Sequence, residues 1–296
     1  MDWITGIQNA VDYLEEHLTD ELSYEEIARQ AACSEFYFQR IFNILCGMPL
    51  GEYIRSRRLT LAGNELSAAD ARILDVALKY GYDSPESFTR AFVRFHGITP
   101  SEAKKDGKRL KALSRVSVQI ILQGGSVMNY RIETKEAFQV LERAERHSID
   151  DERNRNSVPE FWTRSHADGT VGYLLAQAPD RKYVFGICYG NAPKEVKTFD
   201  YGIAAPYGGG EIPEGFRVTE IPARTWAVFE CSGPLPGSIQ ETWHKICAEF
   251  FPTSGYQPTY EMDVEAYPSP EAMSADDYSC EIWVAVKKKV PSESGN

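Results

Sequence analysis

The chain has 296 residues, which is enough for two domains that each have a hydrophobic core. Its formal net charge of −11 excludes a uniformly basic nucleic-acid binder, but the charge is unevenly distributed. Residues 27–115 contain fifteen Lys and Arg against nine Asp and Glu, whereas residues 1–26 contain eight acids and no Lys or Arg. A basic segment of this kind is typical of a surface beside phosphates, so we expect nucleic-acid contacts within it.

The cysteines and the N-terminus indicate the compartment. The six cysteines are scattered without metal-ligand spacing, which favours small buried side chains in a reducing environment. The N-terminal residues do not resemble a signal peptide, and no apolar run is long enough to span a membrane. We therefore expect a cytoplasmic protein that binds no membrane, no metal and no cofactor.

Two stretches of the basic segment repeat each other. Residues 34–47 read SEFYFQRIFNILCG, and residues 84–97 read SPESFTRAFVRFHG. In both copies the apolar residues recur with the spacing of one buried helix face, and a serine suited to an N-cap precedes the helix. A shorter apolar helix and a turn precede each copy. Helix, tight turn and helix, present twice, predict two helix-turn-helix units that read double-stranded DNA.

The helix face opposite the apolar stripe carries the candidate DNA contacts, which are Phe36, Gln39, Arg40, Glu86, Ser87, Thr89 and Arg90. Arginine pairs with guanine and glutamine with adenine, so Arg40, Arg90 and Gln39 suit base edges. Phe36 either contacts a thymine methyl or belongs to the core. Glu86 either accepts from cytosine or favours the helix N-terminus. On the helix that joins the repeats, Arg55, Arg57 and Arg58 are candidates for phosphate contacts, above all Arg55 and Arg58, with a solvated face as the alternative.

The second half of the chain has its own repeat. Residues 130–140, YRIETKEAFQV, are similar to residues 216–226, FRVTEIPARTW, and each copy precedes a capped helix with a tryptophan and two strand-like segments. This order predicts β-α-β-β twice, in a pseudo-symmetric α+β domain with its helices on one sheet face. The other face, or the centre between the halves, is then available as a cleft.

The last strand-like segment carries the candidate effector site. Alternation places Cys280, Ile282 and Val284 on one face, and Glu281 and Trp283 on the other. A carboxylate beside a large aromatic ring suits a cationic aromatic ligand. The alternative is that both side chains point into solvent at the edge of the sheet and bind nothing. A second pair of the same kind is formed by Trp226 and Glu230.

Both halves resemble known families. Residues 77–100, ALKYGYDSPESFTRAFVRFHGITP, are similar to the hallmark string of the AraC/XylS family of bacterial transcription regulators, and the resemblance covers about residues 5–105. Residues 129–288 resemble the GyrI-like small-molecule-binding domain through the tandem halves and the strings TWHKICAEFFPTSGY and CEIWVAV. The second resemblance implies an amphipathic, frequently cationic aromatic effector and an acidic residue on the last strand, where Glu281 falls.

We therefore predict two domains. An all-α tandem helix-turn-helix DNA-binding domain covers residues 1–110, a linker covers 111–128, and an α+β pseudo-symmetric (β-α-β-β)x2 effector-binding domain covers 129–290, followed by a disordered tail at 291–296. The predicted protein is a ligand-responsive transcription regulator whose partners are double-stranded DNA and a small-molecule effector, with RNA polymerase as a further candidate. Two alternatives stay open: a small-molecule hydrolase fused to a DNA-binding domain, and a sequestering module without an effector.

Overall fold

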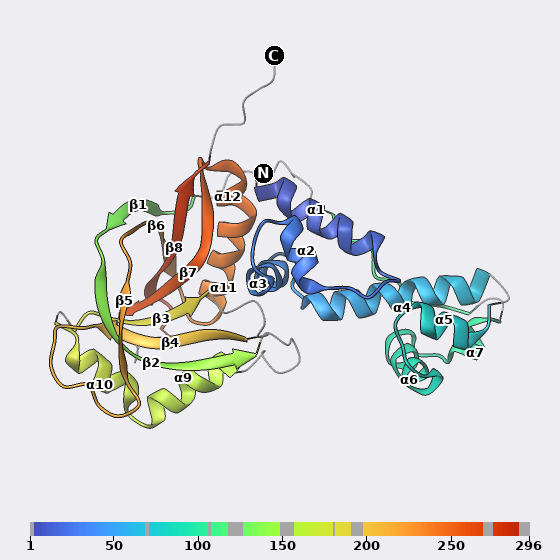
Figure 1. Cartoon of the computed structure of the whole chain (residues 1–296), viewed down its shortest axis with the longest axis horizontal. Coiled ribbons are helices and arrows are strands. Elements are labelled where there is room, and N and C mark those ends of the chain that lie inside the picture. The colour runs from blue at the N-terminus through green and yellow to red at the C-terminus, as the bar shows by residue number, and fades with distance from the viewer. Residues whose placement is uncertain are drawn as a thin grey trace, which may run out of the picture. The chain divides into compact units, whose positions relative to one another are not determined.

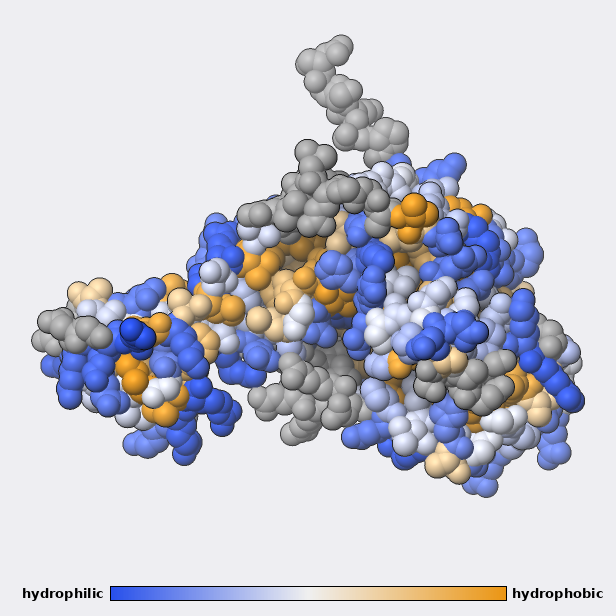
Figure 2. Space-filling model, turned by 180° about the vertical axis from the view of Figure 1, so that it is seen from behind, coloured by the Kyte–Doolittle hydropathy of each residue, from blue (hydrophilic) through white to orange (hydrophobic). Residues whose placement is uncertain are grey.

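The computed structural model describes residues 3–68, 71–105, 108–117, 127–148, 157–179, 181–190, 198–268 and 275–289. The chain divides into two compact units, residues 3–120 and residues 121–296. The predicted tail at 291–296 and residues 118–126 of the predicted linker lie outside the described residues. Within the described ranges, no helix is long and apolar enough to cross a membrane. Hydrophilic side chains cover much of the visible surface, with hydrophobic patches between them (Figure 2).

The first unit is helical (Figure 1). Its helices are α1 (Trp3–Glu16), α2 (Tyr24–Gln30), α3 (Glu35–Cys46), α4 (Leu50–Ala68), α5 (Ile73–Lys79), α6 (Pro85–His96) and α7 (Pro100–Ala103). The repeated helices α3 and α6 begin and end alike. Ser34 and Ser84 accept a hydrogen bond from the backbone three residues on, and Gly47 and Gly97 close the helices at φ of 68° and 80°. The two predicted helix-turn-helix units are therefore α2–α3 and α5–α6.

Helix α4 belongs to the cores of both helix-turn-helix units. Near its start, the ring of Tyr53 lies 5.2 Å from that of Phe42 in the first unit. Further along, Leu59 and Leu66 pack in one cluster with Phe88 and Phe92 of the second. The two cores contact α4 at different positions along its length, and its buried residues consequently extend from Leu50 to Leu66. Shared burial along one helix connects the two recognition helices within the unit.

The second unit is an eight-stranded antiparallel sheet with helices. Its elements are β1 (Tyr130–Lys135), β2 (Phe138–Ser148), α9 (Ser157–Ala167), α10 (Thr170–Gln177), β3 (Tyr183–Tyr189), β4 (Thr198–Pro206), β5 (Arg217–Ile221), β6 (Arg224–Ser232), α11 (Gly237–Lys245), the π-helical η1 (Ile246–Phe250), α12 (Phe251–Thr253), β7 (Tyr256–Pro268) and β8 (Ser279–Lys288). The strand order is β1-β6-β8-β7-β3-β4-β2-β5.

The strand order shows how the two halves are related. The order is symmetric about its centre: read from one end it is β1, β6, β8, β7, and read from the other end it is β5, β2, β4, β3, which are the corresponding strands of the other half. The predicted tandem repeat is thereby confirmed, and each half has one more strand at its start than the pattern predicted. Each additional strand pairs with the other half, β1 with β6 and β5 with β2. The two halves consequently exchange their first strands.

The two faces of this sheet differ. Helices cover one face (Figure 1). On that face Trp162 Nε1 donates to Tyr201 Oη over 3.0 Å, and Trp243 Nε1 donates to Glu265 Oε1 over 2.9 Å. We call the opposite face the inner face. It curls on itself, because Ile221 of β5 and Trp226 of β6, near opposite ends of the strand order, share one buried cluster. The predicted cleft face is therefore largely filled by its own apolar side chains.

Candidate DNA-binding and effector sites

Helix α6 presents part of the predicted DNA contacts. Phe88 and Phe92 are fully buried on one side of the helix, while Glu86 and Arg90 are exposed on another and Thr89 is half-buried. The hydroxyl of Ser87 donates to the carbonyl of Ser84 over 2.8 Å, which makes it part of the helix cap. Of the predicted contacts on α6, the side chains that are open to solvent and not used in the cap are therefore those of Glu86, Thr89 and Arg90.

Helix α3 differs from the predicted exposed face. Phe36 and Gln39 are buried, at 9% and 7% exposure, whereas Arg40 is half-buried. The ring of Phe36 packs edge-on against Tyr37 with centroids 5.7 Å apart, and the amide of Gln39 donates to Glu35 over 3.1 Å. Arg40 stands at the position in the repeat that Arg90 has in α6, so the two arginines form an equivalent pair.

The arginines of α4 have separate roles. Arg55 is exposed, as a phosphate contact requires. Arg58 is not placed as predicted, because its Nε donates to the carbonyl of Leu18 over 2.7 Å and its Nη2 to that of Asp20 over 2.8 Å. Two backbone carbonyls thus hold the Arg58 guanidinium against the connection between α1 and α2, and its role is to position this part of the fold.

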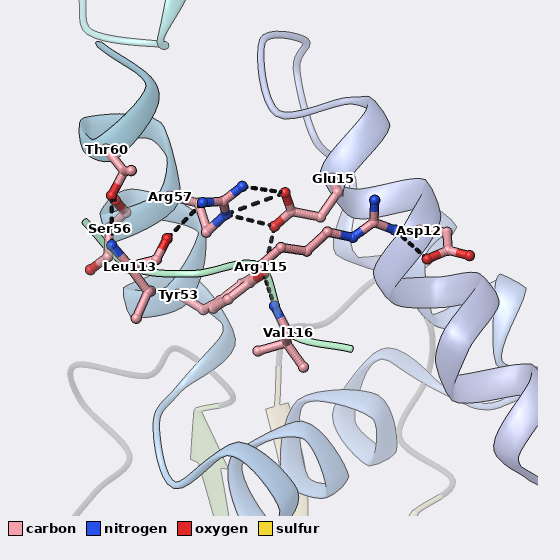
Figure 3. A network of polar contacts seen from close by, with 9 residues as sticks. All are labelled: Asp12, Glu15, Tyr53, Ser56, Arg57, Thr60, Leu113, Arg115 and Val116. Atoms are coloured by element: carbon pink, nitrogen blue, oxygen red, sulfur yellow. Dashed lines mark hydrogen bonds and ion pairs between the residues drawn. The ribbon is translucent and has the colours of Figure 1, made fainter. Parts of the chain in front are cut away.

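The segment 108–117, part of which was predicted as linker, lies extended along the first unit, and we call it the strap (Figure 3). The amide of Lys111 donates to His96 Nδ1 over 3.2 Å, and that of Leu113 donates to Thr60 Oγ1 over 2.9 Å. The amide of Val116 donates to the Tyr53 hydroxyl over 2.9 Å. Backbone donors along the strap are therefore satisfied by side chains of α4 and α6.

A buried ion pair lies beneath the strap. Arg57 Nη2 is 2.8 Å from Glu15 Oε2, and Arg57 Nη1 donates to the carbonyl of Leu113 over 2.6 Å (Figure 3). Tyr53 donates to Glu15 as well, and burial together with this hydrogen bond raises the pKa of Tyr53, which keeps the hydroxyl protonated. The Glu15 carboxylate thus joins α1 to α4, and Arg57 and Tyr53 join α4 to the strap. Arg57 is therefore not placed as a phosphate contact, and sequence analysis did not identify Glu15 as its partner.

The predicted effector residues lie on the inner face. In the register of β6 with β8, Glu281 is opposite Glu230 and Trp283 is opposite Val228. Trp283 Nε1 donates to Glu281 Oε2 over 2.8 Å, and the Glu281 side chain is 17% exposed. Trp283 belongs to the same inner-face cluster as Trp226 but keeps 6% exposure. Trp226 differs from the prediction because it is fully buried in the inner-face cluster, so it belongs to the core and has no surface open to a ligand.

Strand β1 adds cations that sequence analysis missed. Arg131 Nη1 lies 2.8 Å from Glu281 Oε1, and this hydrogen bond raises the pKa of Arg131. Lys135 Nζ lies 4.5 Å from the centroid of the Trp283 ring and 2.5 Å from Glu133 Oε1. These residues alternate along β1, and their cross-strand partners on β6 place them on the inner face. The candidate site therefore consists of a tryptophan, carboxylates and two cations.

A hollow adjoins this group of side chains. It has a volume of about 380 Å³ and is lined by Met128, Asn129, Tyr130, Arg131, Val228 and Glu230. Such a volume is within the range of small-molecule sites. Two of the lining residues, Val228 and Glu230, are the cross-strand partners of Trp283 and Glu281, which do not line the hollow themselves.

A second carboxylate is buried in the other half. Glu142 is fully buried and accepts from Tyr189 Oη over 2.7 Å, from Arg217 Nε over 2.8 Å and from Thr219 Oγ1 over 2.5 Å. The absence of a side chain at Gly202 makes space for this carboxylate, since a Cβ there would lie 2.1 Å from Glu142 Oε2. The repeat spacing of 86 residues aligns Glu142 with the apolar Val228, and this mismatch was the available sequence signal.

Comparisons with known proteins agree with this architecture. Residues 131–286 match the family of integron-associated effector binding proteins, and residues 27–106 match a helix-turn-helix domain family. The chain is 41% identical over 95 residues to the transcriptional activator AarP of Providencia stuartii, covering 32% of this chain and 70% of AarP. It is 38% identical over 96 residues to the regulatory protein SoxS of Escherichia coli K12, covering 32% of this chain and 90% of SoxS.

Two solved structures are similar to more than half of the chain. SAV2435 bound to tetraphenylphosphonium has a TM-score of 0.48 at 18% identity, covering 54% of this chain and 94% of that one. An integron cassette protein of Vibrio cholerae has a TM-score of 0.40 at 19% identity, covering 53% and 95%. The helix-turn-helix repeat and the family matches together identify the chain: it belongs to the AraC-type transcription regulators and carries a GyrI-like effector-binding domain of the integron-associated family.

Proposed function

We propose that this regulator reads DNA through α3 and α6 and that a cationic aromatic effector controls it from the inner face of its sheet. The observation that carries the effector proposal is the contact of Trp283 with Glu281 beside an open hollow. An aromatic ring and a carboxylate in one place attract a cation by two independent interactions. The acidic side chain of Glu230 across from Glu281 adds to the negative potential.

The DNA proposal rests on the equivalence of α3 and α6. Arg40 and Arg90 stand at the same position of two helices that are capped alike. Recognition helices of this kind bind the major groove, and their arginines suit the O6 and N7 atoms of guanine. Thr89 and Glu86 lie beside Arg90 as further candidates for base contacts, whereas the burial of Phe36 and Gln39 removes them from this set. The exposed Arg55 on α4 is the candidate for a phosphate contact.

The effector proposal is tested with two probes of similar shape. Tetraphenylphosphonium is a cation surrounded by phenyl rings, and triphenylphosphine oxide is its neutral counterpart. Calorimetric titration of the full-length protein should give tighter binding of the cation. Glu281→Gln, which removes the charge and keeps the shape, should weaken the cation about ten-fold or more and the neutral probe little. Equal losses for both probes would overturn charge recognition by Glu281.

A hydrolysable probe separates a sensor from a hydrolase, since both phosphorus probes lack a bond that hydrolysis can cleave. A sensor returns its ligand unchanged, so chromatography after prolonged incubation of the protein with a cationic aromatic ester should recover the ester in full. Regulation requires in addition that the effector changes the affinity for DNA. Fluorescence anisotropy on DNA selected for binding should shift when tetraphenylphosphonium is added, and Glu281→Gln should abolish that shift. An unchanged DNA affinity at saturating probe would reject the regulatory part of the proposal.

A further inference from the structure

The cations of β1 reach the effector site across another strand. Strand β6 lies between β1 and β8 in the sheet, so β1 and β8 are separated by two strand spacings, about 10 Å. Only a long side chain can cover this distance over the inner face. Both Arg131 and Lys135 do so, since Arg131 contacts Glu281 and Lys135 lies over the ring of Trp283.

These two contacts are the ones that a cationic aromatic ligand needs. Lys135 supplies a positive charge at the face of an aromatic ring, and Arg131 supplies a positive charge at a carboxylate. The hydrogen bond from Trp283 to Glu281 joins ring and carboxylate into one site. In this structure, the chain's own side chains therefore occupy the place where the proposed effector would bind.

The pseudo-symmetry of the unit does not call for a lysine at position 135. At the repeat spacing of 86 residues, Arg131 corresponds to Arg217, which likewise contacts a carboxylate, that of Glu142. Lys135 corresponds to Ile221, an apolar residue of the inner-face core. A lysine stands at this position only in β1, the strand that lies beside β6 and β8. We therefore connect its role with the ring of Trp283 on β8 and not with the architecture.

Both contacts are weak enough to be exchanged. The side chains of Arg131 and Lys135 are 44% and 30% exposed, and ion pairs at such exposure contribute only about 0–1 kcal/mol each. A ligand that makes the same contacts with less conformational freedom to lose can replace them. When displaced, both cations can return to water, and a cationic ligand takes the place of Arg131 at Glu281.

We propose that Lys135 and Arg131 act as an internal competitor for the effector site, so that they set both its affinity and its selectivity for cations. The proposal rests on the effector site of Glu281 and Trp283. An effector must displace Lys135 from the ring before it can stack, and Arg131 before it can approach Glu281. A neutral aromatic molecule can replace only the first of these contacts, and it leaves the displaced charges without compensation.

The test compares Lys135→Met with Lys245→Met in the full-length protein. The first keeps the length of the side chain and removes the charge over Trp283. The second removes an exposed charge from α11, on the helix-covered face, and controls for net charge. Lys135→Met should tighten the binding of tetraphenylphosphonium about two- to thirty-fold, as expected for the loss of a competing cation–π contact. Lys245→Met should leave the binding unchanged.

Arg131→Met provides a second and independent variant. It should also increase the affinity for tetraphenylphosphonium, and it should increase the affinity for triphenylphosphine oxide less. Only the cation is attracted by the Glu281 carboxylate that the substitution releases. Unchanged or weaker cation binding in both variants would overturn the proposal. Its failure can be told apart from failure of the site itself: if Glu281→Gln weakens the cation while Lys135→Met does not tighten it, the site stands and the internal competitor falls.

Discussion

The guanidinium of Arg58 lies against Gly81, where a Cβ would be 2.6 Å from Arg58 Nη1. Gly81 belongs to the turn between α5 and α6 and has φ of 81°, so it needs glycine for its backbone as well. The same guanidinium binds the carbonyls of Leu18 and Asp20 in the first helix-turn-helix unit. Arg58 therefore connects the two helix-turn-helix units, and two recognition helices with a fixed separation can bind successive major grooves.

Substitution of Gly81 by alanine tests this connection. Gly81→Ala should lower the free energy of unfolding by more than Gly97→Ala, which has φ of 80° but nothing within 4 Å of its Cβ. Both variants carry the strain of left-handed backbone, roughly 1–2 kcal/mol, and only Gly81→Ala must also displace Arg58. Urea unfolding of the two proteins makes the comparison. Equal losses would show that Arg58 does not depend on Gly81.

The buried ion pair under the strap should contribute strongly to stability. Glu15→Gln leaves Arg57, 12% exposed, without its counter-charge, and breaking a buried pair in this way costs about 3–5 kcal/mol. The control is Arg29→Met, which breaks an exposed pair with Glu25 and should cost less than about 1 kcal/mol. A loss of similar size in the two variants, measured by chemical denaturation, would contradict the role given to Glu15.

His96 should make attachment of the strap dependent on pH. Burial lowers the pKa of His96, and its neutral Nδ1 accepts from the amide of Lys111. As the pH falls through about 6.5, the unfolded chain takes up the proton first, so the stabilisation present at neutral pH is lost on acidification. The protection factor of the Lys111 amide, which compares its exchange rate with the intrinsic rate at the same pH, should therefore fall between about pH 7.5 and about pH 5.5. A His96→Gln variant that keeps the same pH dependence would refute this assignment.

Two of the inner-face carboxylates, Glu142 and Glu281, should respond differently to neutralisation. Glu142→Gln disturbs a fully buried group with three donors, and we expect a loss of about 1–3 kcal/mol in stability. Glu281→Gln changes a partly exposed group and should leave the melting temperature nearly unchanged. Thermal unfolding of both variants decides the matter, and a destabilised Glu281→Gln would assign this residue to the fold as well.

What the sequence predicts is mainly local. The caps and apolar stripes of α3 and α6 involve residues within one or two helical turns, so the repeat predicts both helices. The contact of Arg58 with Gly81 and that of Glu15 with Arg57 join distant parts of the chain, and no periodicity contains them. For the same reason, Arg58 was predicted at DNA although its guanidinium is held by backbone carbonyls.

The second unit shows the same limit for strands. The similarity of residues 130–140 to residues 216–226 indicates two halves, but alternation within β1 and β5 does not reveal which half each strand joins. Exchange of these strands is what brings Lys135 over Trp283. The burial of Trp226 has a related cause, because the curl of the sheet fills the inner face with side chains from both halves.

The exposed arginines of the DNA-binding unit should divide into those that contact bases and those that contact phosphates. Arg90→Ala should cost about 1–3 kcal/mol on preferred DNA and relax the preference at one base position. Arg55→Ala should weaken binding to all sequences alike and reduce the salt dependence, as expected for a phosphate contact. Titrations on specific and random duplexes at several salt concentrations distinguish the two. A base-specific effect of Arg55→Ala would reverse its assignment.

Selection of binding sites from random duplex DNA tests the central claim most directly. If α3 and α6 each read a major groove from one rigid unit, the enriched sequences should contain two conserved boxes about one helical turn apart. Selection with Arg40→Ala should relax one box, and selection with Arg90→Ala should relax the other. Enrichment of a single box, or relaxation of the same box by both variants, would contradict the proposed tandem reading of DNA.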